Sequence, residues 1–319
     1  MSTDDVSGDI TTRTENAPRE LLTRSFFFFC AILSVITTIS IVVLLVTEAA
    51  RFFELTAGLM NVTGETASIV EFLSGTTWQI NTGNFGVLPL VSATLQITIG
   101  SAVIALPLGV ATAIYLSEYA TPRLRSILKP ALEILAGIPT VVYGFFALIY
   151  ITPALDTVIP DLGFFNMLSA SIVVGIMIIP MVASISEDAM SAVPDELRQA
   201  GYGMGATKFD VSVGVVVPAA ISGILSSFIL ALSRAIGETM AVTIAAGSQA
   251  NLHNPLNPVD YLEGAMPMTA AMVQLLTGDI TGGGLAYRSL FAIGLALFVI
   301  TLAMNIISNL IAERYREGY

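Results

Sequence analysis

The chain has 319 residues, of which 55% are hydrophobic and only 12% are charged, and its mean hydropathy is +0.81. This composition excludes an ordinary soluble domain, because the surface of such a domain needs more charge. The formal net charge of −11 argues against nucleic-acid binding, and a single cysteine and a single histidine exclude a disulfide framework and a zinc cluster.

Six apolar stretches are each long enough for the roughly 20 residues that cross a bilayer. We predict spans over about 26–50, 92–117, 130–153, 167–187, 217–246 and 286–311. The first is too long for a signal-peptide core and lacks a small-residue cleavage site, so we expect it to remain as a membrane helix. The sequence therefore predicts an all-α integral membrane protein with six transmembrane helices.

The spans divide the chain into four parts. Residues 1–24 form an acidic tail, 25–91 hold the first span and a long outer loop, 92–311 hold five spans, and 312–319 form a second tail. The outer loop contains Trp78, either as an aromatic residue at the membrane interface or as part of a docking surface for an external partner. No Gly-Lys-Ser/Thr sequence occurs, so the chain has no P-loop and we expect no ATP hydrolysis by the chain itself.

Lysine and arginine fall mainly on one side of the predicted helices. They are Arg13, Arg19 and Arg24 before the first span, Arg123, Arg125 and Lys129 after the second, Arg198 and Lys208 after the fourth, and Arg314 and Arg316 after the sixth. The other side has only Arg51 and Arg288, each at a helix edge. Because such residues collect in cytoplasmic loops, we expect a multi-pass protein of the cell membrane with both termini in the cytoplasm.

The polar segment between the fourth and fifth spans predicts two short helices joined by a tight, glycine-dependent turn. Its defining residues are Glu196, Arg198, Gln199, Ala200, Gly201, Gly205 and Ala206, with Pro218 at the entry to the next span. At full spacing this segment resembles the EAA loop, the cytoplasmic loop through which ABC-importer permeases meet their ATPase. The usual Glu-Ala-Ala reads Gln199-Ala200-Gly201 here, so the first position lacks a charge. The resemblance implies an amphipathic helix that docks into a groove on a soluble partner, and an ordinary polar loop is the alternative.

Two ionisable residues, Arg234 and Glu238, fall inside the predicted fifth span. Each costs about 2.5–3.5 kcal/mol at a helix centre on insertion scales, so their presence needs a reason. Because they are four residues apart in a predicted helix, we expect them on one face. A guanidinium cannot neutralise itself, and its planar fork suits an oxyanion, which makes Arg234, partly compensated by Glu238, a candidate site for an anion in transit. A structural ion pair is the alternative. We expect Glu187 and Asp188 to be interfacial.

Longer motifs resemble the PstC-type permease subunit of phosphate ABC importers over roughly residues 72–310. They are Ser117-Glu118-Tyr119-Ala120, the run from Gly137 to Phe146, the run from Gly175 to Pro180, Ser186-Glu187-Asp188-Ala189, Ala192-Val193-Pro194, and the run from Ser233 to Met240. The resemblance implies the type I ABC importer permease architecture, with cytoplasmic coupling helices and alternating access. It also implies that Arg234 and Glu238, flanked by Ser233 and Thr239, act in phosphate translocation.

The resemblance further implies a set of partners. These are a PstA-like permease, a PstB-like ATPase dimer, an external phosphate-binding protein, phosphate itself and the surrounding membrane lipid, with no cofactor. The loop near 191–208 would carry the motion of the ATPases to the fifth helix. A permease for another oxyanion, such as molybdate, sulfate or phosphonate, is one alternative. A stand-alone secondary transporter that uses Glu238 as a proton or ion site is another, and the EAA-like loop argues against it.

Overall fold

The computed structural model describes residues 18–53, 67–254, 257–278 and 284–314. Most of the predicted acidic tail (1–17), the middle of the first outer loop (54–66) and most of the second tail (315–319) lie outside the described residues. Within them, four helices are long and apolar enough to cross a membrane, and six spans result if each of two bent helix pairs counts as one. The all-α membrane fold is thereby confirmed, with four to six candidate spans.

The single-helix spans contain α2 (Pro18–Phe52), α4 (Leu88–Ile114), α8 (Met167–Ser191) and α15 (Leu285–Arg314). A π-helical turn, η3 (Tyr115–Tyr119), extends α4. The first bent pair joins α5 (Pro122–Ala136) at 87° to a segment of α6 (Thr140–Phe146), η4 (Ala147–Ile151) and α7 (Thr152–Asp156). The second joins a segment of α10 (Lys208–Val211), η5 (Ser212–Val216) and α11 (Val217–Ala219) at 69° to α12 (Ile221–Ile236).

The spans predicted over 130–153 and 217–246 are broken helices rather than continuous ones. In the first, Gly137 and Pro139 interrupt the chain between α5 and α6, because proline lacks a backbone donor and disfavours helix in the residue before it. In the second, the helix breaks at Ala220 and again after Ile236, before α13 (Met240–Ala246). The second break separates the two ionisable residues that were expected on one helix.

The centre of the molecule is the contact between α4 and α8, the most extensive helix contact among the described residues. Glycine makes this close approach possible, because a Cβ added at Gly109 would lie 2.6 Å from Val182. Buried apolar side chains such as Val174 and Ile178 fill the interface, and α12 and α13 also pack on α8. The site residues are therefore carried on helices that surround one rigid pair.

A second core lies beside the start of α15. Its elements are α3 (Ile69–Ser74), the antiparallel hairpin of β1 (Trp78–Gln79) and β2 (Asn84–Phe85) around η2 (Ile80–Thr82), and α14 (Met268–Thr277). The short helix η6 (Pro258–Leu262) packs on α8 instead. Trp78 pairs with Phe85 across the hairpin, and its indole is buried in an aromatic cluster that includes Phe52. Trp78 is thus a core residue. The two roles predicted for it, at the membrane interface or in a docking surface, stay predictions.

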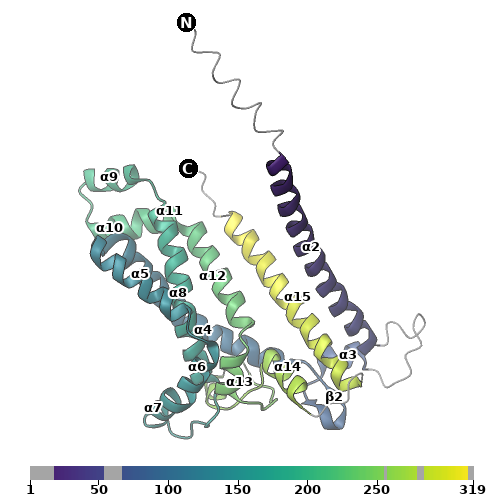
Figure 1. Ribbon diagram of the computed structural model, residues 1–319. Coiled ribbons are helices and arrows are strands. Elements are labelled where there is room, and N and C mark those ends of the chain that lie inside the picture. Colours follow the sequence, from purple (N-terminus) through teal and green to yellow (C-terminus); the bar gives the residue numbers. More distant parts are fainter. Residues whose placement is uncertain (1–17, 54–66, 255–256, 279–283, 315–319) are drawn as a thin grey trace.

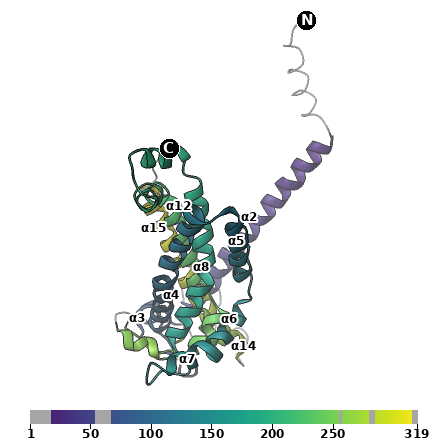
Figure 2. The same ribbon diagram turned by 90° about the vertical axis from the view of Figure 1, so that its left-hand side faces the viewer.

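The ends of the spans sort into two groups. The start of α2, the end of α15, and the short helices α9 (Asp195–Gly203) and α10 lie at one end of the molecule, whereas α3, β2, α7 and α14 lie at the other (Figure 1). In the second view, α2 diverges from the other helices toward its N-terminal end (Figure 2). Its side chains there are exposed, Phe26 and Phe29 among them, as suits a helix that meets lipid or another subunit.

Candidate functional site

The predicted coupling loop forms two short helices, α9 and α10, joined by a tight turn. Gly205 in this turn has φ +80°, a left-handed conformation that a side chain rarely adopts. Gly201 faces α10, where a Cβ would lie 2.9 Å from a methyl of the fully buried Val211. A capping box between Thr207 and Asp210 starts α10. The turn and the contact at Gly201 hold the two helices as one unit.

The loop presents some of its predicted residues to solvent and buries others. Glu196, Gln199 and Ala200 are exposed, while Gly201 is buried and Ala206 packs against an apolar cluster beneath the loop. Large apolar side chains are exposed next to them: Tyr202, Met204, Phe209 and Val213. An exposed apolar surface rimmed by polar residues is typical of a protein–protein contact.

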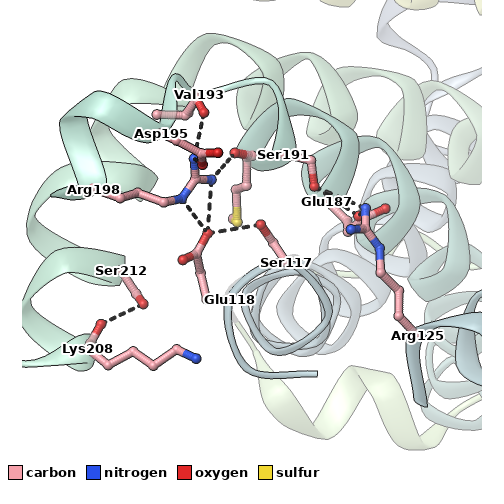
Figure 3. Close-up of polar contacts among 11 residues, drawn as sticks. Ser117, Glu118, Arg125, Glu187, Ser191, Val193, Asp195, Arg198, Lys208 and Ser212 are labelled. Carbon is pink, nitrogen blue, oxygen red and sulfur yellow. Dashed lines mark hydrogen bonds and ion pairs between the residues drawn. The ribbon is translucent and has the colours of Figure 1, made fainter. Parts of the chain in front are cut away.

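Arg198 points inward from α9, toward the ends of α4 and α8 (Figure 3). Its guanidinium donates to the carboxylate of Glu118 at 3.1 Å, to the carbonyl oxygen of Met190 at 2.8 Å and to that of Val193 at 2.5 Å. It also forms an ion pair of 3.2 Å with Asp195. Arg198 was predicted to couple to the ATPase, and the structure places its side chain between helices of this chain.

A second ionic cluster joins α5 to α8 beside the first. The carboxylate of Glu187, which is completely buried, accepts from Arg125 (Figure 3). It also accepts from Lys129, which reaches Asp188 at 2.9 Å as well. Ser191 donates to the same carboxylate of Glu187 at 3.1 Å. Glu187 is thus covered by α5, whereas the side chain of Asp188 is 65% exposed. That both lie near the membrane interface stays a prediction.

Arg234 lies in the last turn of α12 with its side chain exposed. Among the described residues its side chain makes no hydrogen bond and no ion pair, although its charge acts on Tyr143 of α6. The hydroxyl of Tyr143 donates to the carbonyl oxygen of Leu135 at 2.8 Å, so it is engaged elsewhere. The donors of the guanidinium are therefore unused among the described residues.

Glu238 does not share a helix face with Arg234, and the expected compensation of one by the other is wrong. The helix ends at Ile236, and the carboxylate of Glu238 accepts from the backbone N–H of Ala241 at 3.2 Å, at the start of α13. Its own carbonyl oxygen accepts from Thr269 of α14 at 2.7 Å. A carboxylate at a helix N-terminus is favourable, so Glu238 holds the break between α12 and α13 in place.

The two flanking residues have local partners. Ser233 donates to Asn305 of α15 at 2.7 Å, which joins α12 to α15. Thr239 donates to the carbonyl oxygen of Gly237 at 3.2 Å. Of the four predicted translocation residues, only Arg234 has a side chain with no hydrogen bond or ion pair in the described part of the chain.

Sequence reasoning missed the partners of the coupling loop in η3. The sequence placed Glu118 and Tyr119 in a family motif but predicted no contact for either residue. In the structure Glu118 pairs with Arg198, and the ring centroid of Tyr119 lies 5.0 Å from the ammonium of Lys208. Glu118 and Arg198 are 80 positions apart in the sequence, so no local pattern shows their pairing. The spacing of Thr207 and Asp210, by contrast, could have predicted the start of α10.

At the opposite end of the molecule, the second core contains a hollow of about 480 Å³. Its polar lining is uncharged: Thr77, Gln79, Asn81, Ser248, Asn251 and Gln274. Without a lysine or arginine in this lining, the hollow suits hydrogen-bonding groups of a partner better than a free anion.

The family model described as the binding-protein-dependent transport system inner membrane component matches residues 105–317, which include α9, α10, Arg234 and Glu238. The chain belongs to this family. Members of the family are permeases, and the permease itself is therefore a transport subunit rather than an enzyme. The multi-pass membrane location follows from the same finding and from the apolar helices.

Similar proteins include a probable ABC transporter permease, YqgH, of Bacillus subtilis, which is 32% identical over 88% of this chain and 89% of its own length. Phosphate transport system permease proteins PstC of Mesorhizobium japonicum and Haemophilus influenzae are 33% and 34% identical, over 76% and 77% of this chain and 78% and 82% of theirs. The resemblance to PstC-type permeases is confirmed.

Solved structures agree on the fold. The permease resembles a chain of a bacterial ABC transporter that imports alginate, with a TM-score of 0.64, 12% identity, and coverage of 94% of this chain and 97% of that one. It also resembles a chain of the MetNI methionine ABC transporter, with a TM-score of 0.54, 17% identity, and coverage of 77% and 100%. At these identities the likeness shows the importer permease fold alone.

Proposed function

We propose that this permease translocates inorganic phosphate into the cytoplasm as the PstC-like subunit of an ATP-driven importer. The observation that carries the proposal is the identity to phosphate permeases over three quarters of the chain, 33% and 34% for the two named above. The free guanidinium of Arg234 supports it, because a planar cation with unused donors suits a tetrahedral oxyanion.

The orientation follows from the distribution of basic residues. Arg125 and Lys129 of α5 contact Glu187 near the end of α8, and Arg198 of α9 contacts Met190 beside it. The helices α9 and α10, which carry Arg198 and Lys208, lie at the end of the molecule where α2 starts and α15 ends (Figure 1). This end faces the cytoplasm, since lysine and arginine collect on that side. Both termini are then cytoplasmic, and the hollow in the second core faces outward.

The same orientation assigns a surface to each partner. A PstB-like ATPase dimer docks on the exposed apolar side chains of α9 and α10, and an external phosphate-binding protein docks on the outer hollow. A PstA-like permease completes the path beside Arg234, whose side chain is exposed in the single chain. Pairing with a second permease explains why a charged side chain at this depth is left uncovered.

In this mechanism the anion enters between the two permeases and meets Arg234, which offsets its charge during passage. ATP binding closes the ATPases and moves the coupling loop, so that the path opens to the cytoplasm. Transport in one direction requires that the outward-open and inward-open states of the importer bind the anion with different affinity. Glu238 positions α13 beside the path and does not neutralise Arg234 in this state.

The proposal is tested by uptake into proteoliposomes that contain the permease with its partner permease and ATPase. Radiolabelled phosphate should accumulate only when ATP is supplied on the ATPase side and loaded binding protein on the other. Excess unlabelled phosphate should compete, whereas sulfate, molybdate and methylphosphonate should not. Uptake of one of these oxyanions in preference to phosphate would assign a different substrate. Uptake without the ATPase would instead favour a secondary transporter.

A further inference from the structure

The coupling loop, formed by α9 and α10, contacts the π-helical turn η3 at the end of α4. In this turn the backbone N–H of Ala120 donates to the carbonyl oxygen of Tyr115, five residues earlier, at 2.8 Å. Turns of this kind are local departures from the α-helix and are frequent at functional sites. Two adjacent residues of η3 receive a cation, one from each helix of the loop.

The first contact is between Glu118 and Arg198 of α9. The two side chains are 5% and 14% exposed, so their ion pair of 3.1 Å is shielded from solvent. The same guanidinium holds the carbonyl oxygens of Met190 and Val193 at the end of α8. Pulling α9 away from α4 would leave buried charges unpaired, which is costly.

The second contact is between Tyr119 and Lys208 of α10, whose ammonium lies 5.0 Å from the ring centroid. A cation over an aromatic face is attracted by the ring quadrupole. Beneath both contacts, Ala113 of α4 packs in one apolar cluster with Val211 of α10 and Met190 of α8. The loop, η3 and the end of α8 are therefore joined by polar and apolar contacts on three elements.

We propose that Glu118 and Arg198 form a latch through which the coupling loop moves α4, and that Glu118 is a positioning residue for transport. This inference rests on the proposed function, since it takes α9 and α10 as the docking helices for the ATPase. Motion reaches α8 along its contact with α4, and passes from α8 to α12 through packing and a buried bond of 2.9 Å between Ser186 and Ser227. Arg234 sits at the far end of α12. The coupling loop is also joined to α12 directly along the chain, through η5 and α11. The contacts through α4 and α8 are therefore a second path by which its motion reaches α12.

The test uses the reconstituted importer and measures ATP hydrolysis with and without loaded binding protein. Glu118→Ala should keep the ATPase in the purified complex but lower the stimulation by binding protein about tenfold, as expected for loss of a charged hydrogen bond. Glu118→Gln keeps an oxygen that Arg198 can reach, and should restore most of the stimulation. Glu133→Ala is the matched control, because Glu133 is exposed on α5 and its side chain makes no hydrogen bond or ion pair among the described residues.

Two results would overturn the latch. One is stimulation within about twofold of wild type in an assembled Glu118→Ala complex, a difference too small for a lost charged hydrogen bond. The other is loss of the ATPase from that complex, which would make Glu118 a residue that only shapes the dock. A different result would contradict the proposed function, namely the absence of phosphate uptake by the wild-type complex. The ratio of stimulated hydrolysis between variant and wild type tests the latch whichever anion the binding protein carries.

Discussion

Lys129 of α5 and Glu187 of α8 form an ion pair of 2.8 Å in which the carboxylate is completely buried. Arg125 bonds the other oxygen of this carboxylate, so two cations from one amphipathic helix converge on one anion in the core. This arrangement fixes α5 on α8 just before the chain bends by 87° into α6. The inner ends of α5 and α8 therefore depend on one another.

Glu187→Ala should lower the melting temperature of the purified permease in detergent. The substitution leaves Arg125 and Lys129 without their shared partner, and breaking a buried pair costs up to about 3–5 kcal/mol, an upper range here because both cations are partly exposed. Asp188→Asn is the control, since that side chain is largely exposed. Equal melting of Glu187→Ala and wild type would contradict the structural role of the pair.

Gly205→Val should reduce the amount of ATPase that copurifies with the permease while leaving membrane insertion intact. Valine at φ +80° is strained by about 1–2 kcal/mol or more, so the turn between α9 and α10 should change shape. Gly203→Val places the same side chain two residues away, where φ is not positive and a Cβ meets no neighbour within 4 Å. If both variants retained the ATPase and normal uptake, this loop would not be the dock.

Trp78→Ala should destabilise the outer part of the permease, because a buried aromatic side chain is lost from the second core. Such a truncation costs about 3–5 kcal/mol. The neighbouring Gln79→Ala removes an exposed side chain from the same hairpin and should have little effect. Limited proteolysis from the outer face measures both, and similar resistance of the two variants would argue against a buried Trp78.

Cysteine labelling tests the orientation. Met204→Cys and Thr82→Cys both place a thiol at an exposed position, at opposite ends of the molecule, and Cys30→Ser removes the native exposed thiol. An impermeant reagent applied to intact cells should label position 82 and should reach position 204 only after the membrane is opened. The reverse pattern would invert the orientation and the docking surfaces with it.

The sequence predicted those features that depend on one segment at a time. Long apolar runs marked the spans, and spaced glycines marked the turn at Gly205, where the backbone is left-handed. The relation between Arg234 and Glu238 failed because it assumed an unbroken helix, whereas the chain turns after Ile236. The pairing of Glu118 with Arg198 depends on how α4 and α9 meet in space, and no local pattern encodes that meeting.

The most direct test of the central claim is phosphate uptake by assembled complexes with Arg234→Gln, Glu238→Gln or both, with subunit content measured in parallel. Arg288→Gln, a half-buried arginine in the first turn of α15, controls for loss of positive charge. We expect Arg234→Gln to abolish uptake in an intact complex, and the double variant to stay inactive, because the two residues form no ion pair whose joint removal could restore transport. Full uptake by a normally assembled Arg234→Gln complex, or recovery in the double variant, would contradict a role for Arg234 in phosphate passage.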